Sequence, residues 1–138
     1  MDEDIRVKFI VSEDVQSQPI PNSPLARNIL INPIFVMRNR WIPATLSLGI
    51  TIVTTGIDFS KEHDIQITLT NRTSGETTYN TGVTKVNMPG GTSDNFTFTV
   101  ELKNTPFENE GIYDINLNID GKVYTDYFKV LKTDDSIK

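Results

Sequence analysis

Cysteine is absent from the 138 residues, and alanine occurs only twice. Without cysteine the chain has no disulfide framework, thiolate zinc site, iron–sulfur cluster or cysteine nucleophile. Against 8 leucines stand 17 threonines and 16 isoleucines. β-Branched side chains lose rotamer freedom in helices and fit pleated surfaces, whereas alanine and leucine favour helices. The composition therefore predicts an all-β protein.

Long apolar runs and clusters of positive charge are also missing from the sequence. No apolar run approaches the roughly 20 residues that a membrane-spanning helix needs. The net charge is −5, and no run of five or more basic residues occurs. The opening, Met1-Asp2-Glu3-Asp4, lacks the positive charge and apolar stretch of a secretion signal. We therefore expect a cytoplasmic protein that binds neither membranes nor nucleic acid.

Apolar and polar side chains alternate with a period of two in several segments, which is the pattern of half-buried strands. The alternation is clearest in 5–11, 46–53, 65–69, 96–102 and 113–119, and is weaker in 28–37, 77–79, 83–88 and 123–131. Residues 12–27, which contain three prolines, are expected to form a loop. We predict an antiparallel β-sandwich of about eight or nine strands, with one domain over 1–133 and a disordered tail over 134–138.

Turn residues divide these segments. Asn71–Gly75 and Asp120-Gly121 predict hairpins. Pro33 predicts a bulge, a sheet edge or a break between two strands, because proline cannot donate to a ladder. We expect Pro33 or Lys85 to guard an edge strand, and a bare edge to pair into a homodimer.

The segment Pro106–Tyr113 carries a resemblance. Gly111-Ile112-Tyr113 entering an alternating strand resembles the tyrosine corner of immunoglobulin-like sandwiches, in which the phenol bonds the backbone of the preceding loop. The layout, with Glu13-Asp14-Val15 after the first strand, is similar to small uncharacterised bacterial proteins of one sandwich domain. The resemblance implies an immunoglobulin-like fold with Greek-key connections and no particular activity.

Asn116-x-Asn118-x-Asp120-Gly121 imitates the first half of a calcium-binding loop, but its final ligand position falls on Tyr127 instead of glutamate. We therefore interpret this motif as a solvated face of a hairpin.

Gly90-Gly91 lacks the Lys-Ser/Thr of a phosphate-binding loop and is interpreted as a turn. We expect neither a metal nor a cofactor.

The single histidine, His63, is followed by Asp64. Neighbouring residues on a strand point to opposite faces, so Asp64 is poorly placed to orient the imidazole as a base. We interpret His63 as an exposed turn residue. Glu13, Asp14, Glu108 and Glu110 are interpreted as solvated loop charges, because no spacing brings two of them together for acid–base chemistry.

Arg38, Arg40 and Trp41 form the candidate protein-binding site, because arginine and tryptophan are enriched at interaction hot spots. The interpretation that we favour is that Trp41 plugs one end of the core while the arginines face water, because large aromatic side chains dominate core burial.

Three functions remain open. The first is a non-catalytic protein-binding or assembly module, with a protein partner. The second is an accessory protein of a phage or mobile element, either a structural component or an inhibitor of a host protein. The third is an enzyme or small-ligand binder whose pocket combines distant residues.

Overall fold

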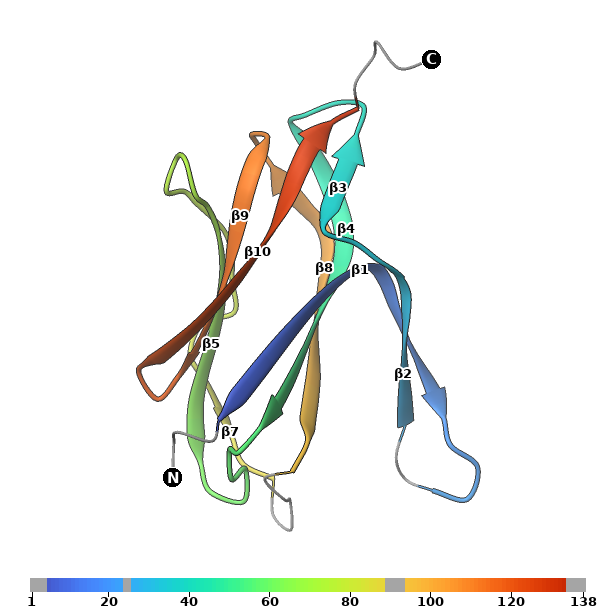
Figure 1. Ribbon diagram of the computed structural model, residues 1–138, viewed down its shortest axis with the longest axis vertical. Helices are drawn as coiled ribbons and strands as arrows, with labels where there is room; N and C mark the ends of the chain where they lie inside the picture. The colour runs from blue at the N-terminus through green and yellow to red at the C-terminus, as the bar shows by residue number, and fades with distance from the viewer. Residues whose placement is uncertain (1–4, 24–25, 89–93, 134–138) are drawn as a thin grey trace.

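The computed structural model describes residues 5–23, 26–88 and 94–133 (Figure 1). These residues form ten strands and no helix, so no helix among them could cross a membrane. The strands are β1 (Arg6–Pro19), β2 (Ala26–Pro33), β3 (Val36–Asn39), β4 (Ala44–Thr55), β5 (His63–Asn71), β6 (Thr77–Asn80), β7 (Thr84–Val86), β8 (Phe96–Phe107), β9 (Gly111–Ile119) and β10 (Lys122–Lys132). The predicted all-β sandwich is confirmed. The expected tail over 134–138 lies outside the described residues.

The strands form two facing sheets. One has the order β2-β1-β4-β8, and the other has the order β3-β10-β9-β5-β6, with β7 also paired to β5. Neighbouring strands are antiparallel except β3, which runs parallel to β10. The chain passes from one sheet to the other five times, between β2 and β3, β3 and β4, β4 and β5, β7 and β8, and β8 and β9.

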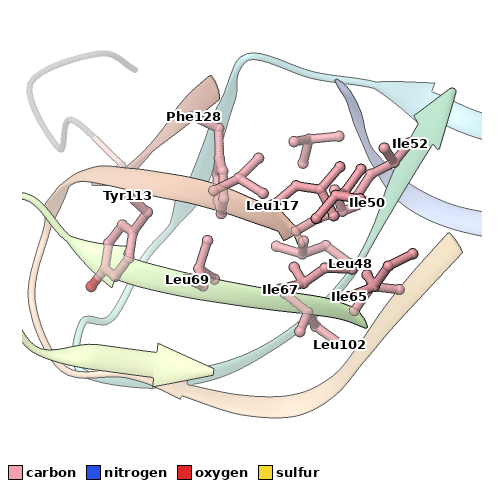
Figure 2. Packing of buried hydrophobic residues seen from close by; sticks show 14 of the residues in the cluster. Leu48, Ile50, Ile52, Ile65, Ile67, Leu69, Leu102, Tyr113, Leu117 and Phe128 are labelled. Atoms are coloured by element: carbon pink, nitrogen blue, oxygen red, sulfur yellow. The ribbon is translucent and has the colours of Figure 1, made fainter. Parts of the chain in front are cut away.

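The core lies between the sheets and is built from one face of each strand. Leu48, Ile50 and Ile52 of β4 point toward the side chains of β5 and β9 (Figure 2). The residues between them, Gly49 and Thr51, lie on the opposite face, as a period of two requires, and are also buried. The large side chains that are buried to 1% exposure or less include Phe59, Phe107, Tyr113, Ile115, Leu117, Phe128 and Val130.

Two hairpins follow the prediction. Asp120-Gly121 joins β9 to β10, and both residues adopt positive φ, at 51° and 88°. Residues 72–76 join β5 to β6. Pro33 ends β2, an edge strand, as expected of a residue without a backbone N–H.

The expected loop over 12–27 is wrong. β1 continues to Pro19 and forms a hairpin with β2 that pairs Ser12 with Pro33 and Pro19 with Ala26. We call this hairpin, 12–19 with 26–33, the arm; Figure 1 shows it standing beside the two layers. Most of its side chains are exposed on both faces. A ribbon of that kind needs no alternation of apolar and polar residues, so the sequence carried no strand signal there.

Candidate protein-interaction surface

Trp41 lies immediately beyond β3, at one end of the sandwich, and is 70% exposed. The favoured interpretation, in which Trp41 plugs the core, is therefore wrong. The Asn39 side chain donates to the Trp41 carbonyl oxygen at 2.6 Å and fixes the turn that carries the ring. The Arg40 guanidinium lies 5.5 Å from the indole centroid, a cation–π contact. The turn thus presents an ordered aromatic side chain to solvent.

Arg38 has a different role from its two neighbours. Its Nη1 donates to the Lys132 carbonyl oxygen at 2.8 Å, which ties β3 to the end of β10. The structure therefore brings Arg38, Arg40 and Trp41 to the same sheet edge. Arg40 and Trp41 form the outward-facing part, and Arg38 positions the strand behind them.

Two further exposed aromatic residues lie on the same edge. Phe35, which precedes β3, is 88% exposed, and Tyr127 of β10 is 50% exposed. Both line a groove of about 300 Å³ whose opposite wall is the Lys8–Val11 segment of β1. The Lys129 amide donates to the Phe35 carbonyl oxygen at 3.0 Å, and the Ile34 amide donates to the Val11 carbonyl oxygen at 2.8 Å. The backbone around Phe35 is thus fixed to both sheets while its ring projects outward.

Sequence reasoning missed Phe35 and Tyr127. Tyr127 lies at a solvent-facing position in the alternation of β10, on the same face as Lys129 two residues later. That position alone could have identified Tyr127 as an exposed aromatic residue. Phe35 follows a proline break, where no periodicity assigns a face. Its exposure depends on the β2–β3 connection, which only the tertiary structure reveals.

Positively charged residues lie near these aromatic side chains, although the carboxylate of Asp126 also lines the groove. Exposed cations on the same edge are Lys8, Arg38, Arg40, Lys129 and Lys132. None of them forms an ion pair with another described residue, whereas Arg72, Lys85 and His63 all do. Five unpaired cations thus lie on this edge although the whole chain carries a net charge of −5. We call Phe35, Trp41, Tyr127 and these five cations the β3–β10 edge.

His63 lies at the opposite end and is not the exposed turn residue that we expected. Its side chain is 18% exposed, at the start of β5. Nδ1 lies 2.7 Å from an Asp120 carboxylate oxygen, and Nε2 lies 2.7 Å from the Asp58 carbonyl oxygen. A carboxylate oxygen and a carbonyl oxygen both accept, so the two hydrogen bonds form together only when the ring is protonated. In that form the ring has no lone pair with which to act as a base.

The pKa values around His63 follow from these bonds. Burial of the ring disfavours its charge, but the hydrogen bonds to Asp120 and to the Asp58 carbonyl outweigh that effect and raise the pKa of His63 above its usual range. Hydrogen bonds from His63 and from the Asp64 amide lower the pKa of Asp120. The side chain and amide of Ser60 lower the pKa of Asp58 in the same way. The sequence did not reveal the His63–Asp120 pair because 57 residues separate its members.

The side chains of the calcium-like motif are used within the hairpin. The Asn116 side-chain oxygen accepts from Thr125 at 3.0 Å, and that of Asn118 accepts from the Gly121 amide at 2.8 Å. Asp120 bonds the Asp64 amide as well as His63. These bonds fit the hairpin interpretation. Among the described residues, no three His, Cys, Asp or Glu side chains gather as metal ligands.

The four carboxylates considered for acid–base chemistry are exposed. Glu13 and Asp14 lie in β1 and not in a loop, which corrects their expected position. Glu110 accepts a hydrogen bond from the Lys132 amide at 2.7 Å. Gly90 and Gly91 lie outside the described residues.

Tyr113 makes the bond that the sequence predicted. Its hydroxyl donates to the carbonyl oxygen of Asn109, in the loop before β9, and its ring is 1% exposed. The ring lies 5.0 Å from that of Phe107, edge to face. Tyr113 therefore anchors the β8–β9 connection to the core.

No curated protein matches the chain. Among solved structures, a β-glucosidase from Listeria innocua is 12% identical, with a TM-score of 0.49 over 93% of this chain and 16% of that chain. Its complex with glucose is 13% identical, with a TM-score of 0.48 over 92% and 16% of the two chains. The X-ray structure of Northeast Structural Genomics Consortium target SoR45 is 14% identical, with a TM-score of 0.38 over 97% and 90%. This chain thus spans a small part of the glucosidases, and likenesses this weak carry no functional conclusion.

A family pattern also matches the chain. The match covers residues 36–128, from the first residue of β3 into β10. It contains Trp41, Tyr127 and the His63–Asp120 pair, and it leaves out the arm and Phe35. The matched span exceeds half of the chain, so this protein belongs to the family of unknown function DUF6941.

Proposed function

We propose that this domain is a non-catalytic protein-binding module and that it contacts its partner through the β3–β10 edge. The observation that carries the proposal is the exposure of Phe35, Trp41 and Tyr127, at 88%, 70% and 50%, along one sheet edge. Scattered apolar residues are normal on protein surfaces, whereas large aromatic side chains gathered with arginine are typical of interface hot spots.

The unpaired cations favour a partner with an acidic surface or segment. Lys8 lines the groove beside Phe35 and Tyr127, and the Arg40 guanidinium covers one side of Trp41. An acidic partner would neutralise these charges, and its apolar side chains would cover the rings. Charge complementarity of this kind accelerates encounter and selects partners, whereas the buried aromatic contacts supply most of the affinity.

The chemistry of His63 supports a non-catalytic function. Its two nitrogens already donate to Asp120 and to the Asp58 carbonyl oxygen, so proton abstraction would first require this pair of bonds to break. The hollow beside it, of about 290 Å³, is lined by two lysines and two aspartates in addition to His63. The cluster is better explained as a structural contact that joins the residues before β5 to the β9–β10 turn. We call Asp58, His63 and Asp120 the His63 clasp.

We further propose that the sandwich is immunoglobulin-like. The Tyr113 bond to Asn109, the repeated crossings between sheets and the short parallel strand β3 beside β10 all support this assignment. In such a scaffold the sheets are rigid, and an edge strand with its flanking turns can vary to suit a partner.

Affinity capture tests the binding proposal. The wild-type domain, a Phe35→Ser/Trp41→Ser variant and a Val83→Ser control are immobilised and exposed to nuclease-treated lysate of the source organism. Val83 is 66% exposed but lies between β6 and β7, away from the β3–β10 edge. We expect one protein to be recovered by the wild type and the control, and recovery by the double variant to fall at least about tenfold, the scale of a hot-spot loss.

Two results would count against this function. Equal recovery by all three proteins would show that the β3–β10 edge is not the contact surface. Capture from a parallel untreated lysate that is absent from the nuclease-treated lysate would assign the edge to nucleic acid, whose phosphates also suit clustered cations.

A further inference from the structure

The arm is the part of the fold that contacts the two layers least. Beyond Ser12, β1 pairs only with β2, and β2 has β1 as its sole partner strand among the described residues. In Figure 1 the arm lies to the right of the sheets. A two-stranded ribbon is marginally stable in water by itself, because it has no second layer to cover its apolar side chains.

The base of the arm, in contrast, is firmly anchored. A Cβ atom at Gly49 would lie 2.5 Å from Cγ2 of Val15, so Val15 occupies the space that a side chain on β4 would fill. Ser12 is fully buried, and its hydroxyl donates to the Asp14 carbonyl oxygen at 3.0 Å. These contacts set the direction of the arm. It is therefore a positioned element of the fold.

The outer edge of β2 has few of the features that protect edge strands. Alternate residues of an antiparallel strand bond to one neighbour, so half of the N–H and C=O groups of β2 face away from β1. The centre of this edge is Ile29-Leu30-Ile31, and Ile31 is 38% exposed. Arg27 is the only charged residue of β2, and Pro33 stands at its end. An apolar edge of this length is a template for pairing with another strand.

The sequence of β2 indicates which strand that is. Asn28-Ile29-Leu30-Ile31-Asn32 reads the same in both directions about Leu30. Two antiparallel copies related by a two-fold axis at Leu30 would place Ile29 opposite Ile31 and Asn28 opposite Asn32, with like side chains meeting at every position. A closed two-fold interface requires this kind of self-complementary surface.

We propose that β2 pairs with β2 of a second copy of this chain about a two-fold axis at Leu30. The pairing joins the two β2-β1-β4-β8 sheets into one continuous sheet of twice the width. It satisfies the outward backbone groups of both arms and covers the isoleucines of each with those of the other. The ladder ends where Asn32 adopts a φ of 54° and Pro33 lacks an N–H, so the dimer has a fixed register and does not grow into a fibre.

Disulfide cross-linking tests the register of the β2–β2 pairing. Because the chain has no native cysteine, an introduced cysteine can form a disulfide only with its counterpart in a second copy. Directly opposite residues of an antiparallel pair have Cα atoms about 4.5–5.5 Å apart, which lies within the range of a disulfide. A Leu30→Cys variant should form a disulfide-linked dimer under mild oxidation. The matched control is Asn28→Cys, whose two copies would lie four residues out of register, about 13 Å apart, and cannot bond.

Cross-linking confined to Leu30→Cys supports the two-fold axis at that residue. Equal cross-linking of both variants would indicate random collision and overturn the proposal, and no cross-linking of Leu30→Cys would do the same. Since the arm lies outside the core, both variants should show the thermal unfolding midpoint of the wild type when reduced.

Light scattering after size exclusion tests the dimer without oxidation. The wild type should have twice the mass of one chain, and Leu30→Lys the mass of one, because two ammonium groups would meet at the axis. Val83→Lys, which adds the same charge elsewhere, should remain dimeric. A wild type that is monomeric up to high micromolar concentration would overturn the pairing. The Phe35→Ser/Trp41→Ser variant should remain dimeric, so this result is separate from that of the capture experiment.

Discussion

Two groups of aromatic side chains in this molecule differ sharply in their exposure to solvent. Phe59, Phe107, Tyr113 and Phe128 are buried to 1% exposure or less, and each ring contacts another aromatic ring. Phe35, Trp41 and Tyr127, along the β3–β10 edge, are at least half exposed. The first group shows that this fold readily covers large rings. The exposure of the second group therefore reflects its position on an edge that the chain leaves open.

Polar groups show the same contrast. At the β5 end, His63, Asp120, Asp64 and Lys85 are linked by hydrogen bonds and ion pairs. On the β3–β10 edge, five cations have no ionic partner among the described residues. A region whose groups satisfy one another stabilises the fold, whereas a region whose groups are unsatisfied is available to another molecule. Substitutions at the two ends should therefore affect different measurements.

The largest effect should come from the core. Leu117→Ala removes a side chain of β9 that is fully buried between the sheets. The lost burial and the cavity left behind should lower the free energy of unfolding by about 2 to 5 kcal/mol. Urea denaturation measures this value. A loss below about 1 kcal/mol would mean that the sheets collapse around the gap and that the core is looser than its burial indicates.

The sequence predicted the core well and the edges poorly, for a physical reason. Alternation marked Leu48, Ile50, Ile65 and Leu117 because a strand between water and a core must alternate. Beyond Ser12 most side chains of the arm are exposed, so residues 13–19 had no alternation to detect. Tyr113 was predicted because its partner lies four residues away, whereas the partner of His63 lies 57 residues away. Arg38, Arg40 and Trp41 were identified by residue type, but only the tertiary structure shows that Phe35 and Tyr127 share their edge.

A smaller effect, dependent on pH, should come from the His63 clasp. The folded state raises the pKa of His63, so this contribution to stability is complete below the pKa of an unfolded histidine, about 6.5, and disappears as the pH rises through the folded value. The pKa values of Asp58 and Asp120 are lowered, so their contribution is complete above about pH 4 and is lost as the pH falls. The clasp should therefore stabilise the fold most between about pH 4 and 6.5.

A His63→Gln variant tests this dependence. Its unfolding free energy should differ most from that of the wild type within the same window, by no more than about 1 kcal/mol, because the Asp120 side chain is 49% exposed and its charge is screened by solvent. The difference should shrink on going from pH 6 to pH 9. A difference that grows over that range would mean that the ring is neutral in the folded protein and that one of its two hydrogen bonds is not formed.

The smallest effect on stability should come from the β3–β10 edge itself. Phe35→Ser and Trp41→Ser remove rings that are 88% and 70% exposed, so each should change the free energy of unfolding by less than about 0.5 kcal/mol. Calorimetry at one pH, with Leu117→Ala measured alongside, checks this. The result separates two explanations of a binding defect. If Trp41→Ser is as stable as the wild type, loss of a captured partner is a loss of contact. If it unfolds several degrees earlier, Trp41 supports the turn after β3, and the contrast between the two groups of aromatic side chains no longer holds at this residue.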